Sequence, residues 1–239
     1  MSETTQPIAS QIETAVGSIP GWSPIDQLLT LFTLTFASAN IGGDVLELGS
    51  WCGRSAVALG MAARLSGNTR VHCIDLFPDK DDWYRNEDGT FSFSVTLAGK
   101  KYGAYQDQTV WAEPYHRDIV PVYQRYGGTL DAFKEAMRVN GLSDLVTPYR
   151  ADMETFAATA PSDLKLRLAF IDGDHNYDAV CNEIRLIERF LLPGGWICFD
   201  DAFSSYEGVN RAILSELVES GRYCQFQQMT RKLFVARKR

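Results

Sequence analysis

The sequence predicts an α/β fold in which a doubly wound, mostly parallel β-sheet carries helices on both faces. Short apolar runs typical of buried strands recur along the chain, and segments with apolar residues at helical spacing lie between most of them. Strands that alternate with helices in this way pair in parallel, because each helix returns the chain to the same edge of the sheet. The 239 residues, 45% of them hydrophobic, suffice for one sizeable domain, and we expect residues 1–239 to form it.

The first half of the chain holds an N-terminal helical segment over residues 1–40 and the start of the alternation. Ser23 and Pro24 precede apolar residues at helical spacing, which predicts a helix with Ser23 as its N-cap and Pro24 as its first residue. The elements expected next are a strand over 44–48, a helix over 54–65 and a strand over 71–74 that ends at Asp75.

The second half repeats the pattern. Helices are indicated by apolar residues three and four apart, and strands by short apolar runs. The expected elements are, in order, a helix over 129–140, strands over 146–149 and 166–171, a helix over 177–191, a strand over 196–199, a helix near 207–219 and closing strands near 224–228 and 233–236.

One long connection, residues 79–128, does not follow the alternation. It is rich in Trp, Tyr and Phe, and it comes after the strand that ends at Asp75. Long connections in compact domains are usually lids or binding loops. We therefore expect an aromatic-rich insert on the ligand side of the sheet, acting as a lid on the acceptor side.

Composition and charge exclude several classes of function. The net charge of −7 argues against a nucleic-acid-binding protein. No segment reaches the roughly 20 apolar residues that cross a bilayer, and residues 1–10 lack the regions of a secretory signal. The five cysteines are widely spaced with no C-x-x-C pair, which favours reduced thiols. We expect a cytoplasmic protein with a small-molecule partner and no membrane partner; whether it forms a homo-oligomer stays open.

A glycine turn follows the first expected strand, at the edge where sheets of this kind bind ligands. The stretch E-L-G-S-W-C-G-R-S from Glu47 to Ser55 is a strand–turn–helix with Gly49 and Gly53 four residues apart. Glycines let the backbone approach a ligand closely, and the helix start offers free N–H groups. Neither the dinucleotide fingerprint G-x-G-x-x-G nor the G-K-[ST] of a P-loop is present, which disfavours a nicotinamide-dependent oxidoreductase.

The pattern E-x-G-x-x-x-G, followed by an acid at the end of the next strand, resembles the class I S-adenosylmethionine-dependent methyltransferases. The resemblance extends from about Gly21 to the closing hairpin. It implies a Rossmann-like sheet of seven strands with an antiparallel last strand. Within the class, E-L-G-x-x-C-G-x-S is similar to the metal-dependent O-methyltransferases of the catechol type and of the macrocin and mycinamicin sugar type.

This resemblance implies S-adenosylmethionine as the cofactor and assigns residues to each of its parts. The implied set is Gly49, Ser50, Trp51 and Gly53 around the methionine part, Ser55 at its carboxylate, Asp75 and Leu76 at the ribose, Asp152 and Met153 beside the adenine, and Glu47 and Asp172 completing the site.

The motifs I-D-G-D-H and F-D-D end two strands that lie side by side in this fold. Three carboxylates, Asp172, Asp200 and Asp201, would converge there without a basic partner and raise one another's pKa. A hard divalent cation would remove this repulsion, and oxygen ligands suit Mg²⁺. The resemblance implies the same three residues as metal ligands, with Asp174 beside them or in competition with them.

His175 is expected to be the general base. By the resemblance, the catechol type has Lys at this position and the sugar type has His. Catechol enzymes also usually have Asn where this chain has Asp201, so both departures favour the sugar type. A histidine with a near-neutral pKa can take the proton of a metal-bound hydroxyl.

The sequence therefore predicts an O-methyltransferase that depends on Mg²⁺ or another divalent cation. Its expected acceptor is a hydroxyl of a sugar, a glycoside or a similar polyhydroxylated small molecule, because two adjacent oxygens would chelate the metal best. The alternatives are a catechol or other phenolic acceptor on the same scaffold, a member of the cephalosporin-hydroxylase-like branch, a nicotinamide-dependent oxidoreductase, and a cofactor-binding regulatory module.

Overall fold

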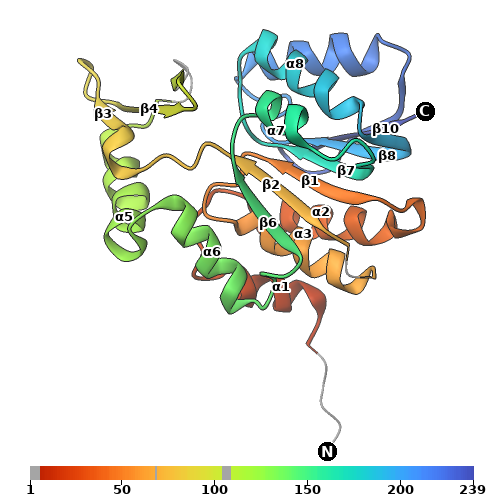
Figure 1. The fold of residues 1–239 in the computed structure, drawn as a ribbon, viewed down its shortest axis with the longest axis horizontal. Coiled ribbons are helices and arrows are strands. Elements are labelled where there is room, and N and C mark those ends of the chain that lie inside the picture. Colours follow the sequence, from red (N-terminus) through yellow and green to blue (C-terminus); the bar gives the residue numbers. More distant parts are fainter. Residues whose placement is uncertain (1–5, 68, 104–108) are drawn as a thin grey trace, which may run out of the picture.

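A seven-stranded sheet forms the centre of the protein in the computed structural model, which describes residues 6–67, 69–103 and 109–239 (Figure 1). The strand order is β6-β2-β1-β7-β8-β10-β9; β10 runs antiparallel to both of its neighbours, β8 and β9, and the other strand pairs of the sheet are parallel. The strands are β1 (Asp44–Leu48), β2 (Val71–Asp75), β6 (Val146–Arg150), β7 (Leu166–Ile171), β8 (Leu191–Phe199), β9 (Tyr223–Gln228) and β10 (Phe234–Lys238). The predicted fold class, including the antiparallel last strand, is confirmed.

Helices cover both faces of this sheet, and each face has its own apolar core. One core joins the sheet to α1 (Ile8–Val16), α2 (Ile25–Ala37), α3 (Arg54–Leu65) and α6 (Thr129–Val139). The other joins it to α7 (Met153–Thr159), α8 (Tyr177–Glu188), α9 (Glu207–Ala212) and the π-helical continuation η5 (Ile213–Val218). Figure 1 shows the two groups on opposite sides of the sheet. In the part of the chain that the structure describes, no helix is both long enough and apolar enough to cross a membrane.

The long connection after β2 folds into a substructure of its own. A short 3₁₀ turn, η2 (Lys80–Asp82), leads into an antiparallel sheet of β3 (Trp83–Arg85), β4 (Phe91–Leu97) and β5 (Lys100–Gly103), which is followed by α4 (Ala112–Pro114), η4 (Tyr115–Ile119) and α5 (Val120–Tyr126). The rings of Phe91 and Tyr115 stack with their centroids 3.8 Å apart and join the strands to the helices. Figure 1 shows this insert to one side of the main sheet. Part of it, residues 104–108, lies outside the described residues, and its action as a lid stays a prediction.

Some element boundaries differ from those predicted. Pro24 has an extended backbone, with φ −74° and ψ 162°, so it is the N-cap of α2, and Ser23 lies before the cap. The helix predicted over 177–191 ends earlier, because Leu191 already pairs with β7. The helix α7 has no counterpart among the predicted elements, since its 7 residues are too few for a periodic apolar pattern. A 3₁₀ turn, η1 (Ala39–Ile41), precedes β1.

Candidate functional site

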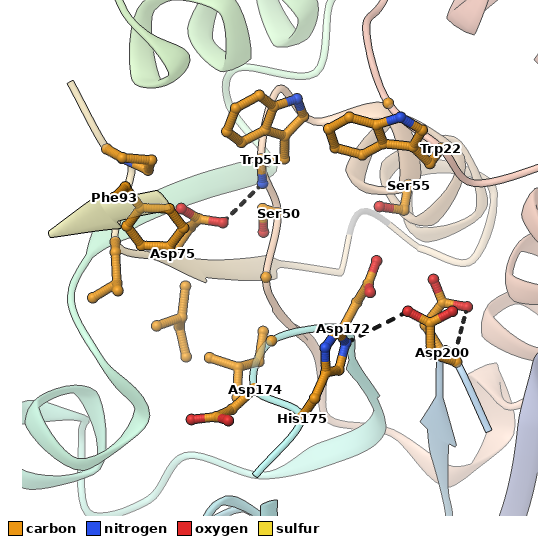
Figure 2. A pocket seen from close by; sticks show the side chains of 18 of the residues that line it. Trp22, Ser50, Trp51, Ser55, Asp75, Phe93, Asp172, Asp174, His175 and Asp200 are labelled. Atoms are coloured by element: carbon orange, nitrogen blue, oxygen red, sulfur yellow. Dashed lines mark hydrogen bonds and ion pairs between the residues drawn. The ribbon is translucent and has the colours of Figure 1, made fainter. Parts of the chain in front are cut away.

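A cavity of about 600 Å³ opens at the carboxyl ends of β1, β2, β6, β7 and β8, next to the insert (Figure 2). This is the edge at which parallel sheets bind ligands. The cavity brings together most of the residues predicted for the cofactor, the metal and catalysis: Gly49, Ser50, Trp51, Ser55, Asp75, Leu76, Asp152, Met153, Asp172, His175, Asp200 and Asp201. Two predicted residues, Glu47 and Gly53, are not among those that line it.

The turn after β1 is built around a close approach between two strand ends. Gly49 has φ +88°, and a Cβ atom on it would lie 1.9 Å from the carbonyl oxygen of Asp172. Glycine is therefore required where the β1 turn meets the end of β7. Gly53 serves packing, because a Cβ there would lie 2.9 Å from Met137 and 3.0 Å from Phe133.

Backbone N–H groups hold Asp75 at the end of β2. Its Oδ2 accepts a hydrogen bond from Trp51 N at 2.9 Å, and its Oδ1 accepts one from Phe77 N at 2.5 Å. Burial raises the pKa of Asp75 above its ordinary value, although these N–H donors oppose the rise. Trp51 and Phe77 have φ values of 46° and 45°, a region that non-glycine residues rarely adopt. Such strain is concentrated at ligand sites, and here it aims two N–H groups at one carboxylate.

Glu47 lies behind the cavity wall. Its side chain is 0% exposed, and neither carboxylate oxygen has a hydrogen-bond partner of good geometry among the described residues. Burial raises the pKa of Glu47 from 4.5 to about 7, while the nearby hydroxyls of Ser55 and Ser50 lower it. Both serines line the cavity. Any influence of Glu47 on a ligand would therefore pass through them.

Asp152 caps α7 and connects the main sheet region to the insert. Its Oδ1 accepts a hydrogen bond from Thr155 N at 2.8 Å, and its Oδ2 lies 2.9 Å from Nζ of Lys100 on β5. Burial alone would raise the pKa of Asp152, but these partners lower it to about 2. Lys100 was not among the predicted residues, because nothing in its local sequence indicates a partner 52 positions away.

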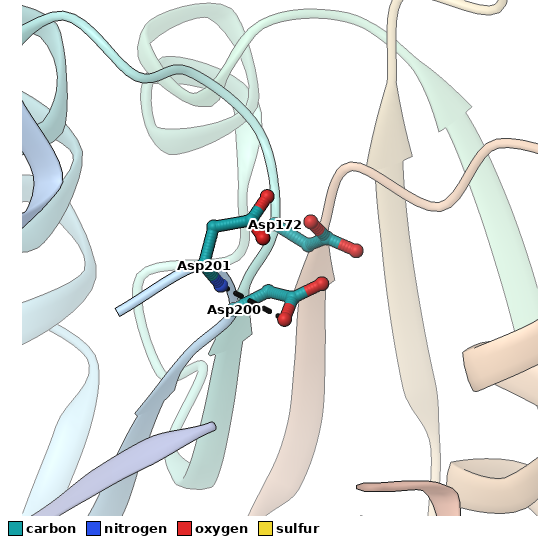
Figure 3. Close-up of side chains that lie close together, drawn as sticks. All are labelled: Asp172, Asp200 and Asp201. Atoms are coloured by element: carbon teal, nitrogen blue, oxygen red, sulfur yellow. Dashed lines mark hydrogen bonds between the residues drawn. The ribbon is translucent and has the colours of Figure 1, made fainter. Parts of the chain in front are cut away.

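Asp172, Asp200 and Asp201 come together at the ends of β7 and β8, with one oxygen of each within 4.8 Å of the others (Figure 3). Burial raises the pKa of Asp172 well above its ordinary value, and the charge of Asp200 adds to the rise. Asp201 has φ +53° and is thus another strained non-glycine residue at this edge of the sheet.

The expectation that these acids lack a basic partner is wrong. Nζ of Lys232 lies 2.8 Å from Oδ2 of Asp200 and 3.5 Å from Oδ1 of Asp201. Lys232 belongs to the turn between β9 and β10, and it reaches the acids because β10 lies beside β8. Burial would raise the pKa of Asp201, but His175 and Lys232 bring it below its ordinary value.

His175 lies beside the acidic cluster, close to Asp172 and Asp200 in Figure 2. Its Nε2 is 3.5 Å from Oδ2 of Asp201, and its ring stacks on that of Tyr206 with the centroids 3.8 Å apart. Gly208 allows this packing, because a Cβ atom on it would lie 2.0 Å from the carbonyl oxygen of His175. The imidazole is thus fixed with one nitrogen toward the acids.

Glu183 and Trp22 are among the further residues that line the cavity without having been predicted for it. Glu183 of α8 has a buried Oε2 with no hydrogen-bond partner among the described residues, and burial raises its pKa well above the ordinary value. The sequence does carry a signal for it, since Glu183 interrupts the apolar helix face of Val180 and Ile184. Trp22 is 55% exposed, with its ring centroid 5.7 Å from that of Trp51.

The donor set of the acidic cluster fits a hard divalent cation. Its members Asp172, Asp200 and Asp201 offer carboxylate oxygens, the ligands that Mg²⁺ prefers. Lys232 contacts two of these three carboxylates, so a divalent cation would neutralise negative charge that the lysine leaves. These three residues would therefore hold a metal.

Comparison with protein families finds a match over most of the sheet. A family model described as a methyltransferase domain matches residues 46–202, which run from β1 to just beyond the acids that follow β8. Among curated proteins, an uncharacterized protein of Acanthamoeba polyphaga mimivirus is 31% identical over 67 residues, or 25% of this chain. That match spans 29% of the mimivirus protein's length.

Solved structures share the fold at low sequence identity. A putative O-methyltransferase from Klebsiella pneumoniae has a TM-score of 0.60 and 13% identity, over 99% of this chain and 92% of that chain. The O-methyltransferase NovP has a TM-score of 0.60 and 16% identity, over 90% and 80% of the two chains. An O-methyltransferase from Bacillus cereus in complex with SAH has a TM-score of 0.58 and 13% identity, over 99% and 94%. These likenesses concern the class I methyltransferase fold.

Proposed function

The chain belongs to the methyltransferase domain family, and on that premise we propose that it is an S-adenosylmethionine-dependent O-methyltransferase that requires Mg²⁺ or another divalent cation. The proposed acceptor is a hydroxyl of a sugar, a glycoside or another polyhydroxylated small molecule. The observation that carries the proposal is the meeting of three carboxylates and one histidine in the cavity that also holds the glycine turn and Asp75.

The cofactor half of the cavity would bind S-adenosylmethionine through the ends of β1 and β2. The turn leads directly into α3, whose first N–H groups are free to bind the methionine carboxylate, with Ser55 beside them. The oxygens of Asp75 accept backbone hydrogen bonds from Trp51 and Phe77, and a carboxylate has about four lone-pair sites, so it can accept more. Asp75 can therefore accept hydrogen bonds from the ribose hydroxyls without losing its backbone partners.

The other half would activate the acceptor. A divalent cation held by Asp172, Asp200 and Asp201 would supply a Lewis acid that lowers the pKa of a bound hydroxyl. His175 would take the hydroxyl proton at Nε2, the nitrogen that faces Asp201. The stacked ring of Tyr206 keeps the imidazole in place, so part of the rate enhancement would come from orientation.

A titration of Mg²⁺ into protein saturated with SAH, followed by calorimetry, tests the proposal. Wild-type protein should bind SAH and then the metal, and the Asp200→Ala variant should bind SAH with the metal signal lost. SAH binding without any metal signal in the wild type would remove the metal from the proposal and keep the cofactor. If SAH itself does not bind, the methyl-transfer activity is refuted.

A catechol or other phenolic acceptor is the second candidate. The observation in its favour is the aromatic part of the cavity wall, where Trp22, Trp83 and Phe93 offer flat faces for a ring. A panel of glycosides with vicinal diols and of catechols, scored by SAH release, separates the two. Turnover of catechols alone would replace the sugar assignment.

A further inference from the structure

We propose that Lys232 is a built-in counter-ion of the acidic cluster and opposes the binding of a divalent metal there, so that the lysine sets how tightly the metal is held. The inference rests on the proposed function, because it concerns the metal that Asp172, Asp200 and Asp201 would hold. The observation behind it is that one ammonium group contacts two of the three carboxylates, at 2.8 Å and 3.5 Å.

The lysine and a metal would use the same carboxylate atoms. Oδ1 of Asp200 already accepts a hydrogen bond from the backbone N–H of Asp201 at 2.8 Å, and Oδ2 is the atom that faces Lys232. Asp200 is nearly buried, with 3% of its side chain exposed, so solvent does little to screen a second cation nearby. A metal that approaches Oδ2 therefore meets the positive charge of the ammonium group, which must move aside or be tolerated at an electrostatic cost.

The local fold fixes the backbone of Lys232 and leaves the side chain as the movable part. Its carbonyl oxygen accepts a hydrogen bond from Ala202 N at 3.0 Å, which ties the turn to the segment directly after the two acids. The next residue, Leu233, is 0% exposed, and its N–H and C=O groups bond to Thr230 and Met229 within the turn. The ammonium group sits on a flexible four-carbon stem, so it can retreat without unfolding the hairpin.

Two effects of opposite sign follow for a variant that lacks this charge. Without metal, Lys232→Met leaves three neighbouring carboxylates with less positive charge, so the melting temperature in EDTA should fall below that of the wild type. With metal, the repulsion is gone, so Mn²⁺ should bind about tenfold more tightly or better. The rise in melting temperature on adding Mn²⁺ should then be larger in the variant than in the wild type.

Binding of Mn²⁺ alone, followed by electron paramagnetic resonance, and melting curves in EDTA and in Mn²⁺ test this on the full chain. Lys238→Met is the matched control. Lys238 lies on the same hairpin, and its ammonium group donates to the carbonyl oxygens of Glu188 and Leu191 at 2.7 Å rather than to the acidic cluster. The Lys238→Met variant should be less stable than the wild type and should bind Mn²⁺ with unchanged affinity. Lys232→Arg keeps the charge and should bind Mn²⁺ like the wild type.

Equal or weaker Mn²⁺ binding by Lys232→Met would overturn the proposal, because equal binding would mean that the lysine has no effect on the metal and weaker binding that it supports the metal ligands. If Lys232→Met fails to fold, the neutral Lys232→Gln variant is measured in its place under the same criteria. If neither wild type nor variant binds Mn²⁺, the metal site and this proposal fall together, while SAH binding still decides the cofactor part of the proposed function separately.

Discussion

The two halves of the cavity hold their acids in different ways. On the cofactor half, both oxygens of Asp75 accept hydrogen bonds from backbone N–H groups, of Trp51 and Phe77. On the other half, which is proposed to hold the metal, Asp200 and Asp201 are paired with charged side chains, above all with Lys232. Backbone donors are fixed once the turns have folded, whereas a side-chain counter-ion can be exchanged for another cation. The comparison indicates that one half is preorganised by folding, whereas the charge of the other is balanced by a side chain that can move.

The largest effect should come from the residue at which the two halves touch. In Gly49→Ala the new methyl group would lie 1.9 Å from the carbonyl oxygen of Asp172, at φ +88°. We expect a loss of more than about 3 kcal/mol in the free energy of unfolding, measured with urea, and loss of both SAH and Mn²⁺ binding.

The control for this change is Gly42→Ala. Gly42 also has positive φ, +76°, but no atom lies within 4 Å of its added Cβ. It should cost about 1 to 3 kcal/mol, because the backbone of Gly42, with φ 76° and ψ −179°, lies in a region that residues other than glycine rarely adopt. Similar losses in the two variants would show that the contact between β1 and β7 does not join the halves.

Two substitutions, one in each half of the cavity, should affect different ligands. Asp75→Asn removes a charged hydrogen-bond acceptor and should weaken SAH binding by about tenfold or more, with Mn²⁺ binding unchanged. Asp201→Asn should lower methyl transfer by about a hundredfold or more, with the SAH dissociation constant within about threefold of the wild type. Calorimetry measures the binding of SAH and Mn²⁺ by each variant, and turnover assays measure its methyl transfer. A change in both ligands from either substitution would contradict the division into two halves.

The cofactor half should nevertheless carry one strong pH dependence. Burial raises the pKa of Glu47 from 4.5 to about 7, so between these values the folded protein binds more protons than the unfolded chain. The stability contributed by this group is therefore complete below pH 4.5 and falls as the pH rises to 7, by up to about 3 kcal/mol. Urea unfolding should show a flatter pH profile for Glu47→Gln. A profile parallel to the wild type would contradict the assignment.

The smallest effect is expected at the link between the cofactor half and the insert. Lys100 is 55% exposed and pairs with Asp152 and Glu154. Exposed pairs contribute less than about 1 kcal/mol and are screened by salt. Lys100→Gln should weaken SAH binding about twofold at low ionic strength, and the difference should vanish in high salt. The exposed neighbour Lys101 supplies the control, Lys101→Gln, which should have no effect at either salt concentration.

Local pattern predicted the main sheet well, because its central strands β1, β2 and β7 are covered on both faces. β7 is buried along its whole length and appears in the sequence as an apolar run that only the buried Arg167 interrupts. The acids that follow such runs could be assigned to one edge of the sheet, and Asp75, Asp172 and Asp200 do line one cavity there. Short elements were not predicted. An example is α7, whose start is fixed by the Asp152 cap rather than by a periodic pattern.

The side chains that pair with the predicted site residues could not be predicted from local sequence pattern. Lys232 belongs to a basic C-terminal stretch that is ordinary for a solvated hairpin, and its pairing with Asp200, 32 positions earlier, arises only from strand order. The link from Lys100 to Asp152 likewise depends on how the insert folds back. Sequence pattern indicates which residues face a ligand. Their counter-ions come from distant segments, and no regular spacing in the sequence connects the two.

The placement of the indole rings gives the protein its own optical signal. Of its 5 tryptophans, Trp22, Trp51, Trp83 and Trp111 line the cavity, and only Trp196 lies elsewhere. Trp22 and Trp51 also border an adjoining cavity of about 480 Å³. Indole emission responds to nearby charge and water, so the unlabelled protein should report by fluorescence when a cationic sulfonium is exchanged for its neutral thioether product.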